Sequence, residues 1–145
     1  MTIAGETRAA IELARREAAL RGDAAVDTDH LLIGIVRTDE SRIGGALRAH
    51  GLSLDRLRGA AGARTGAAHA WRNGRARDRD GRHPISPHVR RVLERALRRA
   101  GRSGTRLDVD AVLDELLREP RGGAAHALAR LRVSRMELRS ALSAA

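Results

Sequence analysis

A segment near the start of the chain returns in a diverged copy farther along, and this internal repeat constrains the fold more than any other feature. The first copy is residues 27–37 (DTDHLLIGIVR) and the second is residues 108–118 (DVDAVLDELLR). The copies are 81 positions apart (108 − 27 = 81), and the same offset pairs Leu47 with Leu128. A sequence that repeats itself at a fixed offset predicts two structural units of the same kind, packed together.

The apolar residues predict that both units are built from helices. The chain has 145 residues but no Phe, no Tyr and one Trp, so its core must consist of Leu, Val, Ile and Ala. These residues recur at the spacing of one helix face, for example at Ala10, Ala14 and Ala18. We expect an all-α protein with four short helices in each unit. The expected helices cover about residues 4–21, 28–37, 41–50 and 53–62, then 87–100, 109–118, 123–131 and 135–142.

Capping residues place several helix ends. Ser86 followed by Pro87 predicts the start of the second unit's first helix, since Ser caps a helix and Pro suits its first position. Either Asp27 or Thr28 is the expected cap of the helix in the first repeated segment. In the first helices the offset becomes 82, so the loop expected at residues 101–106 is one residue shorter than its counterpart.

The repeat divides the chain into three parts. Residues 1–62 form the first unit and residues 84–145 the second. Between them, residues 63–83 lose all periodicity and are rich in Arg and Gly. A segment with so little apolar surface to bury does not offset its chain entropy, so we expect a mobile linker.

The strong positive charge suggests a nucleic-acid partner as the alternative function. The formal net charge is +10, and all 28 basic residues are Arg. A GC-rich genome favours Arg over Lys codons, which accounts for part of this charge without any function. The feature that still supports the alternative is the linker, where Trp71 lies among the arginines at positions 64, 72, 75, 77, 79 and 82. We favour a flexible connector here, and expect neither a nucleic-acid nor a membrane partner.

Other site chemistries find little support in the sequence. There is no Cys, and the six histidines do not form a pair at helical metal-binding spacing with a third ligand nearby, so we expect no metal and no cofactor. His30 is interpreted as a structural residue at a helix start. The first residues lack the features of a signal peptide and no apolar run is long enough to span a bilayer, which predicts a cytoplasmic protein.

The first repeated segment resembles a motif of the N-terminal domain of Clp ATPases of the ClpA and ClpC types. In that family each repeat carries a Gly-Thr-Glu-His-Leu-Leu-Leu-Gly-Leu segment after a loop containing Leu-Gly-His. Residues 27–35 (DTDHLLIGI) follow residues 20–23 (LRGD) in the same arrangement. The resemblance covers nearly the whole chain, and it implies two tandem four-helix repeats packed as one pseudo-symmetric globule.

The second repeat matches the same family less closely. Asp110 keeps the acidic position, whereas Val109 and Ala111 stand where Thr and His are expected. Residues 84–87 (PISP) resemble the Pro-Tyr-Thr-Pro with which the family's second repeat begins.

The resemblance also implies a candidate binding site. ClpC-type domains recognise phosphorylated arginine with the acidic residue of the repeated segment, and Asp29 and Asp110 occupy those positions here, with Thr28 beside the first. A carboxylate binds a guanidinium through two hydrogen bonds, and free N–H groups at a helix start attract a phosphate. The alternative is that both aspartates only complement the helix dipole.

The expected function is a non-enzymatic protein-binding module. A P-loop motor requires a Walker A lysine, and the chain contains no Lys at all, so it is no P-loop ATPase. The resemblance implies partners among substrate proteins, adaptors and other Clp machinery, or a small-molecule ligand of such domains. The module would act as an adaptor, a substrate receptor or a decoy in Clp-dependent proteolysis.

Overall fold

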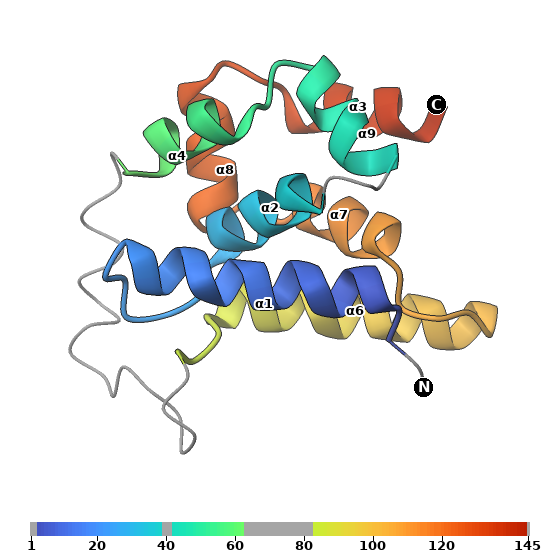
Figure 1. Cartoon of the computed structure of the whole chain (residues 1–145). Coiled ribbons are helices and arrows are strands. Elements are labelled where there is room, and N and C mark those ends of the chain that lie inside the picture. The colour runs from blue at the N-terminus through green and yellow to red at the C-terminus, as the bar shows by residue number, and fades with distance from the viewer. Residues whose placement is uncertain (1–2, 39–41, 63–82, 145) are drawn as a thin grey trace.

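Eight α-helices make up the described part of the chain, four on each side of residues 63–82 (Figure 1). The computed structural model describes residues 3–38, 42–62 and 83–144. The first four helices are α1 (Gly5–Leu20), α2 (Thr28–Arg37), α3 (Arg42–Ala49) and α4 (Leu54–Gly62). The others are α6 (Pro87–Ser103), α7 (Val109–Arg118), α8 (Gly123–Arg130) and α9 (Arg135–Ala144). The predicted all-α fold is confirmed, while the expected linker lies outside the described residues except for His83.

The helices of the two repeats keep the register predicted from the sequence. Helices α2 and α7 begin and end 81 positions apart, and so do α3 and α8. In α1 and α6 the offset is 82. The buried positions show this, since Thr7 and Ala10 of α1 correspond to Val89 and Val92 of α6. A residue of one repeat can therefore be compared directly with its counterpart in the other.

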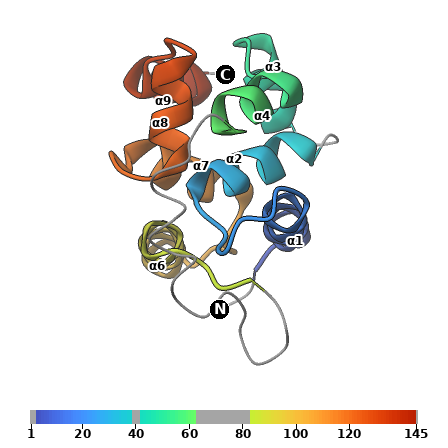
Figure 2. The same cartoon turned by 90° about the vertical axis from the view of Figure 1, so that its left-hand side faces the viewer.

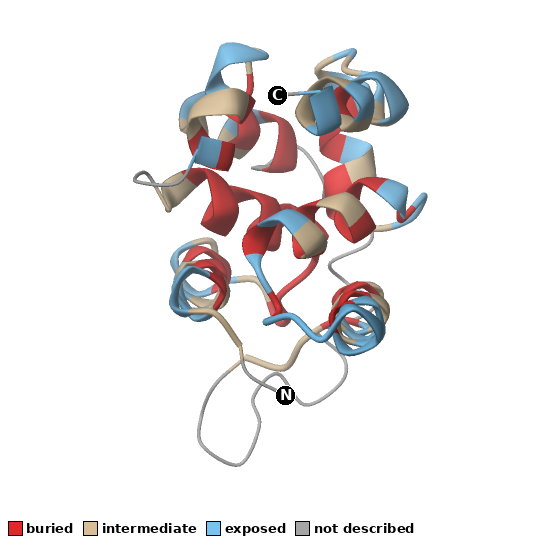
Figure 3. Ribbon diagram, turned by 90° about the vertical axis from the view of Figure 1, so that its right-hand side faces the viewer, coloured by how far each residue is buried: buried red, intermediate tan, exposed pale blue. Residues whose placement is uncertain are grey.

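The helices lie in three layers (Figure 2). The long helices α1 and α6 form one layer, α2 and α7 the middle layer, and α3, α4, α8 and α9 the third. Helix α2 is buried over nearly its whole length, from Thr28 to Val36, because its apolar residues lie on all sides and every side faces another helix (Figure 3). One continuous core of Leu, Val, Ile and Ala side chains joins both repeats.

Two short backbone contacts cross between the repeats. Ile3, just before α1, pairs as an isolated parallel bridge with Leu107, just before α7. Val26, before α2, pairs in the same way with Ile85, before α6, and the N–H of Val26 donates to Pro84 at 2.8 Å. Each repeat thus supplies an extended segment to the other.

The helix ends follow the expected chemistry with one exception. Ser86 Oγ accepts a hydrogen bond from the N–H of Val89 at 3.1 Å, as predicted, and Asp27 is the N-cap residue of α2. The expected loop at residues 101–106 was wrong at its start, since α6 continues to Ser103 and the left-handed cap is Gly104 at φ 67°. Gly101 is accommodated within the helix, because a helical glycine costs only about 1 kcal/mol.

None of the helices in the described ranges combines the length and the apolar character that a bilayer crossing requires.

Candidate functional site

The N-terminus of α2 fastens the first repeat to the second. The carboxylate of Asp27 accepts one hydrogen bond from Ser86 Oγ at 2.9 Å and another from the N–H of Gly123 at 3.0 Å. Thr28 Oγ1 accepts a hydrogen bond from the N–H of Ala124 at 2.9 Å. The first N–H groups of a helix lack partners within that helix. Two side chains from the first repeat therefore cap α8 of the second.

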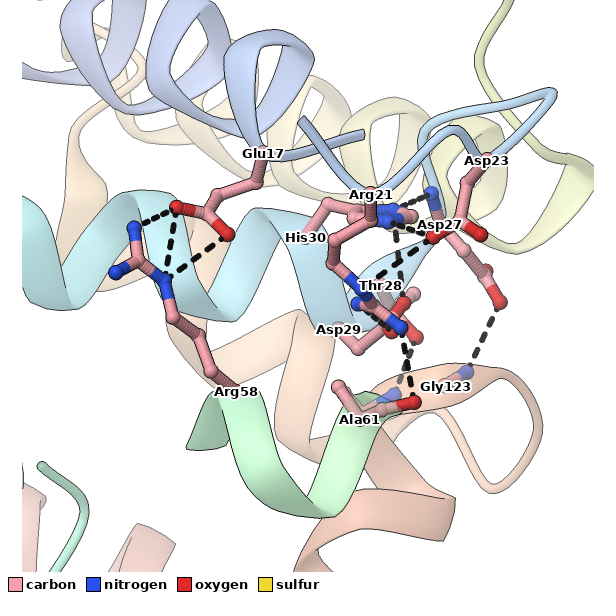
Figure 4. Close-up of polar contacts among 11 residues, drawn as sticks. Glu17, Arg21, Asp23, Asp27, Thr28, Asp29, His30, Arg58, Ala61 and Gly123 are labelled. Atoms are coloured by element: carbon pink, nitrogen blue, oxygen red, sulfur yellow. Dashed lines mark hydrogen bonds and ion pairs between the residues drawn. The ribbon is translucent and has the colours of Figure 1, made fainter. Parts of the chain in front are cut away.

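Asp29 lies beneath a side chain of its own repeat. Its carboxylate is 1% exposed and accepts a hydrogen bond from Arg21 Nη1 at 3.2 Å. The same guanidinium donates from Nη2 to the carbonyl of Ala61 at 2.9 Å and lies 3.6 Å from a carboxylate oxygen of Asp23 (Figure 4). Arg21 is thus held by two carboxylates and one carbonyl, on elements from α1 to α4.

His30 has the structural role predicted for it. Its ring is completely buried, and Nδ1 accepts a hydrogen bond from the N–H of Asp27 at 2.9 Å. Because Nδ1 is an acceptor, the proton resides on Nε2, which contacts Asp23 Oδ2 at 2.7 Å. His30 thereby holds Asp23 beside Arg21.

In the second repeat, the position equivalent to Asp29 borders an open pocket. The carboxylate of Asp110 is 55% exposed, and its partner in the described structure is the equally exposed Arg42, at 3.2 Å. The pocket beside it has a volume of about 320 Å³ and is formed by the ends of α3, α6, α7 and α9. Its apolar floor includes Ile43, Leu113 and Leu117.

The pocket occupies the place that Arg21 fills in the first repeat. Ser103 is the counterpart of Arg21 at the offset of 82, and Leu142 is the counterpart of Ala61 at the offset of 81. Both residues line the pocket together with Asp110. A serine is too short to reach the aspartate as an arginine does, so the space is filled in one repeat and open in the other.

The rim of the pocket carries hydrogen-bond donors as well as acceptors. Arg106 and Thr105 are exposed on the loop between α6 and α7, and both line the pocket. Within the described part of the chain, the guanidinium of Arg106 has no hydrogen bond or ion pair. The exposed carboxylate of Asp110, beside the Arg106 cation and hydroxyl groups, suits a ligand with a positive and a negative group close together.

A group of ion pairs at the base of the pocket keeps two further arginines in place. Asp114 accepts a hydrogen bond from Arg139 Nε at 2.9 Å and another from Arg99. Burial would raise the pKa of Asp114, but the hydrogen bonds from Arg139 and Arg99 outweigh it and hold the pKa below its usual range. The hydrogen bond to Asp114 also raises the pKa of Arg99. These two arginines are therefore engaged by the protein itself.

The first repeat contains the same kind of ion-pair group with its charges exchanged between helices. There the carboxylate is Glu17 of α1, which is 1% exposed and contacts Arg37 at 3.3 Å and Arg58 through both oxygens. Arg99 is the counterpart of Glu17, and the carboxylate of the second repeat lies instead on α7, at Asp114. Each repeat thus has a carboxylate that accepts hydrogen bonds from two arginines, but that carboxylate lies on α1 in the first repeat and on α7 in the second.

Several of these residues were not identified from the sequence. The repeated segment indicated Thr28, Asp29 and Asp110; the first two are buried against internal partners, and of these three Asp110 alone is accessible. Arg21 and Arg106 lie outside the repeated segment and were not predicted. The offset of 82 pairs Arg21 with Ser103. A long charged residue just before the repeated segment of one repeat, with a short one at the same position of the other, was the available signal for Arg21. Among the residues that the structure describes, no group of three His, Asp or Glu side chains could hold a metal ion.

Comparison with known families identifies the class of this helical double repeat. The family model described as the Clp repeat N-terminal domain matches residues 3–131. The chain therefore belongs to the Clp repeat N-terminal domain family, whose members are non-catalytic, substrate-binding modules of Clp machinery. No curated protein matches the sequence.

Solved structures show the same fold. The chain is similar to the N-terminal domain of the caseinolytic protease associated chaperone ClpD from Arabidopsis thaliana, with 22% identity and a TM-score of 0.71 over 96% of this chain and 90% of that one. It is also similar to a chain from a structural study of a malarial protein secretion system, with 15% identity and a TM-score of 0.65 over 99% and 93% of the two chains. The predicted arrangement of two four-helix repeats is confirmed.

Proposed function

We propose that this protein is a non-enzymatic docking module of Clp-dependent proteolysis that recognises phosphorylated arginine on partner proteins through the pocket at Asp110. It would act as an adaptor, a substrate receptor or a decoy for the Clp machinery. Membership of the Clp repeat family supports the general role, because such domains bind substrates and adaptors. The specific ligand is argued from the pocket.

The observation that carries the proposal is the difference between Asp29 and Asp110. In the first repeat an arginine of the chain itself contacts the aspartate. In the second repeat the counterpart of that arginine is a serine, and the equivalent aspartate faces a pocket of about 320 Å³ and pairs instead with the exposed Arg42 of α3. The contact between Arg21 and Asp29 thus shows how an arginine can bind at this position of a repeat. An arginine side chain from another protein can contact Asp110 in the equivalent way.

The rim of the pocket favours an arginine that carries a phosphoryl group. The Asp110 carboxylate accepts hydrogen bonds from the guanidinium nitrogens that remain unmodified. The guanidinium of Arg106 and the hydroxyls of Thr105 and Ser103 line the same pocket and can donate to phosphoryl oxygens. A plain arginine lacks a group for these donors, and its positive charge is repelled by Arg106.

Isothermal titration with phosphoarginine tests the proposal. A hydrogen bond to a charged group contributes about 1.5–3 kcal/mol, so Asp110→Ala should weaken binding by roughly 10- to 100-fold. Asp55→Ala is a matched control, since Asp55 is also an exposed aspartate in the first turn of a helix but lies outside the pocket. Arg106→Ala should weaken phosphoarginine binding and leave the weak binding of arginine itself unchanged or stronger.

Two results would contradict the proposal. Equal affinities of the wild-type protein for phosphoarginine and arginine would show that the phosphoryl group is not recognised. An unchanged affinity in Asp110→Ala would show that phosphoarginine does not bind in the pocket at Asp110. The same titration with an arginine-phosphorylated protein and with its dephosphorylated form extends the test to a macromolecular partner.

A further inference from the structure

We propose that Arg21 is a built-in ligand that closes the first repeat's site, so that the module binds external arginine ligands through the second repeat alone. The identity of the external ligand rests on the proposed function. The closure itself rests on contacts in the first repeat and can be tested without that ligand.

Three contacts converge on the Arg21 guanidinium. Nη1 donates to Asp29, Nη2 donates to the carbonyl of Ala61, and the carboxylate of Asp23 lies 3.6 Å from Nε. The Arg21 side chain is 18% exposed, whereas Asp29 beneath it is 1% exposed. The arginine covers one side of the aspartate as a bound ligand would, while Gly123 at the start of α8 packs against the Asp29 carboxylate from another side (Figure 4).

The two repeats are natural variants of one site. The backbone positions are equivalent, yet Arg21 fills the space in the first repeat and Ser103 leaves it open in the second. The sites also differ at Asp23 and its counterpart Thr105 and at Ala61 and its counterpart Leu142, but Arg21 is the side chain that occupies the space beside the aspartate. Arg21→Ser therefore gives the first repeat the residue that the second, open site has at the same position.

The polar groups of the closed site define its ligand class. Asp23, Asp29 and the Ala61 carbonyl are all acceptors, which suits an unmodified guanidinium. At the offset of 82, Thr105 is the counterpart of Asp23. A phosphoryl group at the first site would face Asp23, whereas at the second it faces a hydroxyl. Once opened, the first site should bind alkylguanidinium and discriminate against phosphoarginine.

The functional consequence is a module with one working site. Phosphoarginine should bind with one ligand per chain. Two linked sites on one chain would raise the affinity for doubly modified partners by avidity. With the first site closed, a peptide with two phosphoarginines should gain only the statistical factor of about two over a peptide with one.

The experiment opens the first site in a chain whose second site is disabled. The variant Arg21→Ser with Asp110→Ala is compared with Asp110→Ala alone, and the probe is ethylguanidinium, with ethylammonium as the control cation. A ligand at ten times its Kd should raise the Tm of the double variant by roughly 3–6 °C. Ethylammonium should not, because its compact ammonium lacks the planar fork that matches Asp29 and Ala61 together. Neither cation should raise the Tm of Asp110→Ala alone.

A second readout follows Asp29 directly. Carbodiimide labelling read by mass spectrometry should leave Asp29 unmodified in the wild-type protein and modify it in Arg21→Ser, with the exposed wild-type Asp110 as the positive control. If Arg21→Ser fails to fold, Arg21→Lys serves instead, since lysine keeps the charge but cannot contact both partners at once. Arg21→Lys should also increase the labelling of Asp29 above the wild-type level.

The outcomes separate this inference from the proposed function. Unmodified Asp29 in the folded Arg21 variants, or stabilisation by ethylammonium equal to that by ethylguanidinium, overturns the closure. Two phosphoarginines bound per wild-type chain overturn it as well. If wild-type protein binds no phosphoarginine but Asp29 becomes reactive and ethylguanidinium stabilises the double variant, the proposed function fails and the closure stands.

Discussion

Thr28 of the first repeat caps a helix of the second, because its Oγ1 accepts a 2.9 Å hydrogen bond from the backbone N–H of Ala124. Both residues are buried, so water cannot replace the hydroxyl. The family motif places a threonine at this position, and the structure gives that threonine a role in joining the repeats. Val109 is its counterpart in the second repeat and has no hydroxyl to offer.

Removing this hydroxyl should destabilise the protein. Thr28→Val keeps the shape of the side chain but leaves a buried N–H without a partner, which costs about 1–3 kcal/mol. Urea denaturation measures the loss. The amide of Ala124 should exchange with solvent faster in Thr28→Val and at the wild-type rate in Thr28→Ser, which retains the hydroxyl. Equal exchange in all three proteins would show that the cap does not protect this amide.

Gly34 should not tolerate a side chain. A Cβ at this position would collide with the carbonyl oxygen of Ala10, where α2 packs closely on α1. Overpacking of this kind costs about 1–3 kcal/mol, so Gly34→Ala should lower the midpoint of urea denaturation. Gly45→Ala in α3 is the control, since among the described residues a Cβ there meets only Arg48, at 3.8 Å. That substitution should stabilise the protein by about 1 kcal/mol through helix propensity.

The buried carboxylate of Glu17 should contribute more to stability than an exposed one on the same helix. Glu17→Gln weakens the charged hydrogen bonds to Arg37 and Arg58, each of the kind that contributes about 1.5–3 kcal/mol. The exposed Glu12 is the control, and Glu12→Gln should change the free energy of unfolding by less than about 0.5 kcal/mol. A similar effect of both substitutions would mean that burial adds nothing to the Glu17 contacts.

Asp114 should make the free energy of unfolding depend on pH in the acidic range. Its pKa is lower in the folded protein than in the unfolded chain, because the hydrogen bonds from Arg139 and Arg99 outweigh burial. The stability from this difference is fully present above the unfolded pKa of about 4, and it is lost as the pH falls through the folded pKa. Asp114→Asn should therefore be less stable than wild type at pH 7. The gap should narrow below about pH 4 in urea denaturation at several pH values.

The repeat register was predictable from the sequence because a duplicated helix keeps its buried positions. Leu47 and Leu128 are fully buried in their repeats, and a change of register would expose them. Helix starts were predictable where a local cap exists, as at Ser86. The end of α6 was predicted too early, at Gly101, although the offset of 82 pairs Gly104 with Gly22, and both glycines have a left-handed backbone at φ 67° and 69°.

The candidate site was predictable only in part. The sequence indicated Asp29 and Asp110 through their place in a motif, but periodicity assigns residues to helix faces and says nothing of how far a long side chain reaches. Arg21 lies eight positions before Asp29 and reaches it across a loop. The alternative of nucleic-acid binding depends on residues 64–82, which lie outside the described residues, so it stays a prediction.

The backbone bridge between Ile3 and Leu107 has a consequence for synthesis on the ribosome. Its two segments are separated by 104 positions (107 − 3 = 104), an unusually distant contact for a helical protein. At 5–20 residues per second, roughly 5–20 s pass between the appearance of Ile3 and that of its partner. During that interval the segment at Ile3 of the nascent first repeat has no backbone partner. The bridge to Leu107 can form only when the start of α7 has left the exit tunnel.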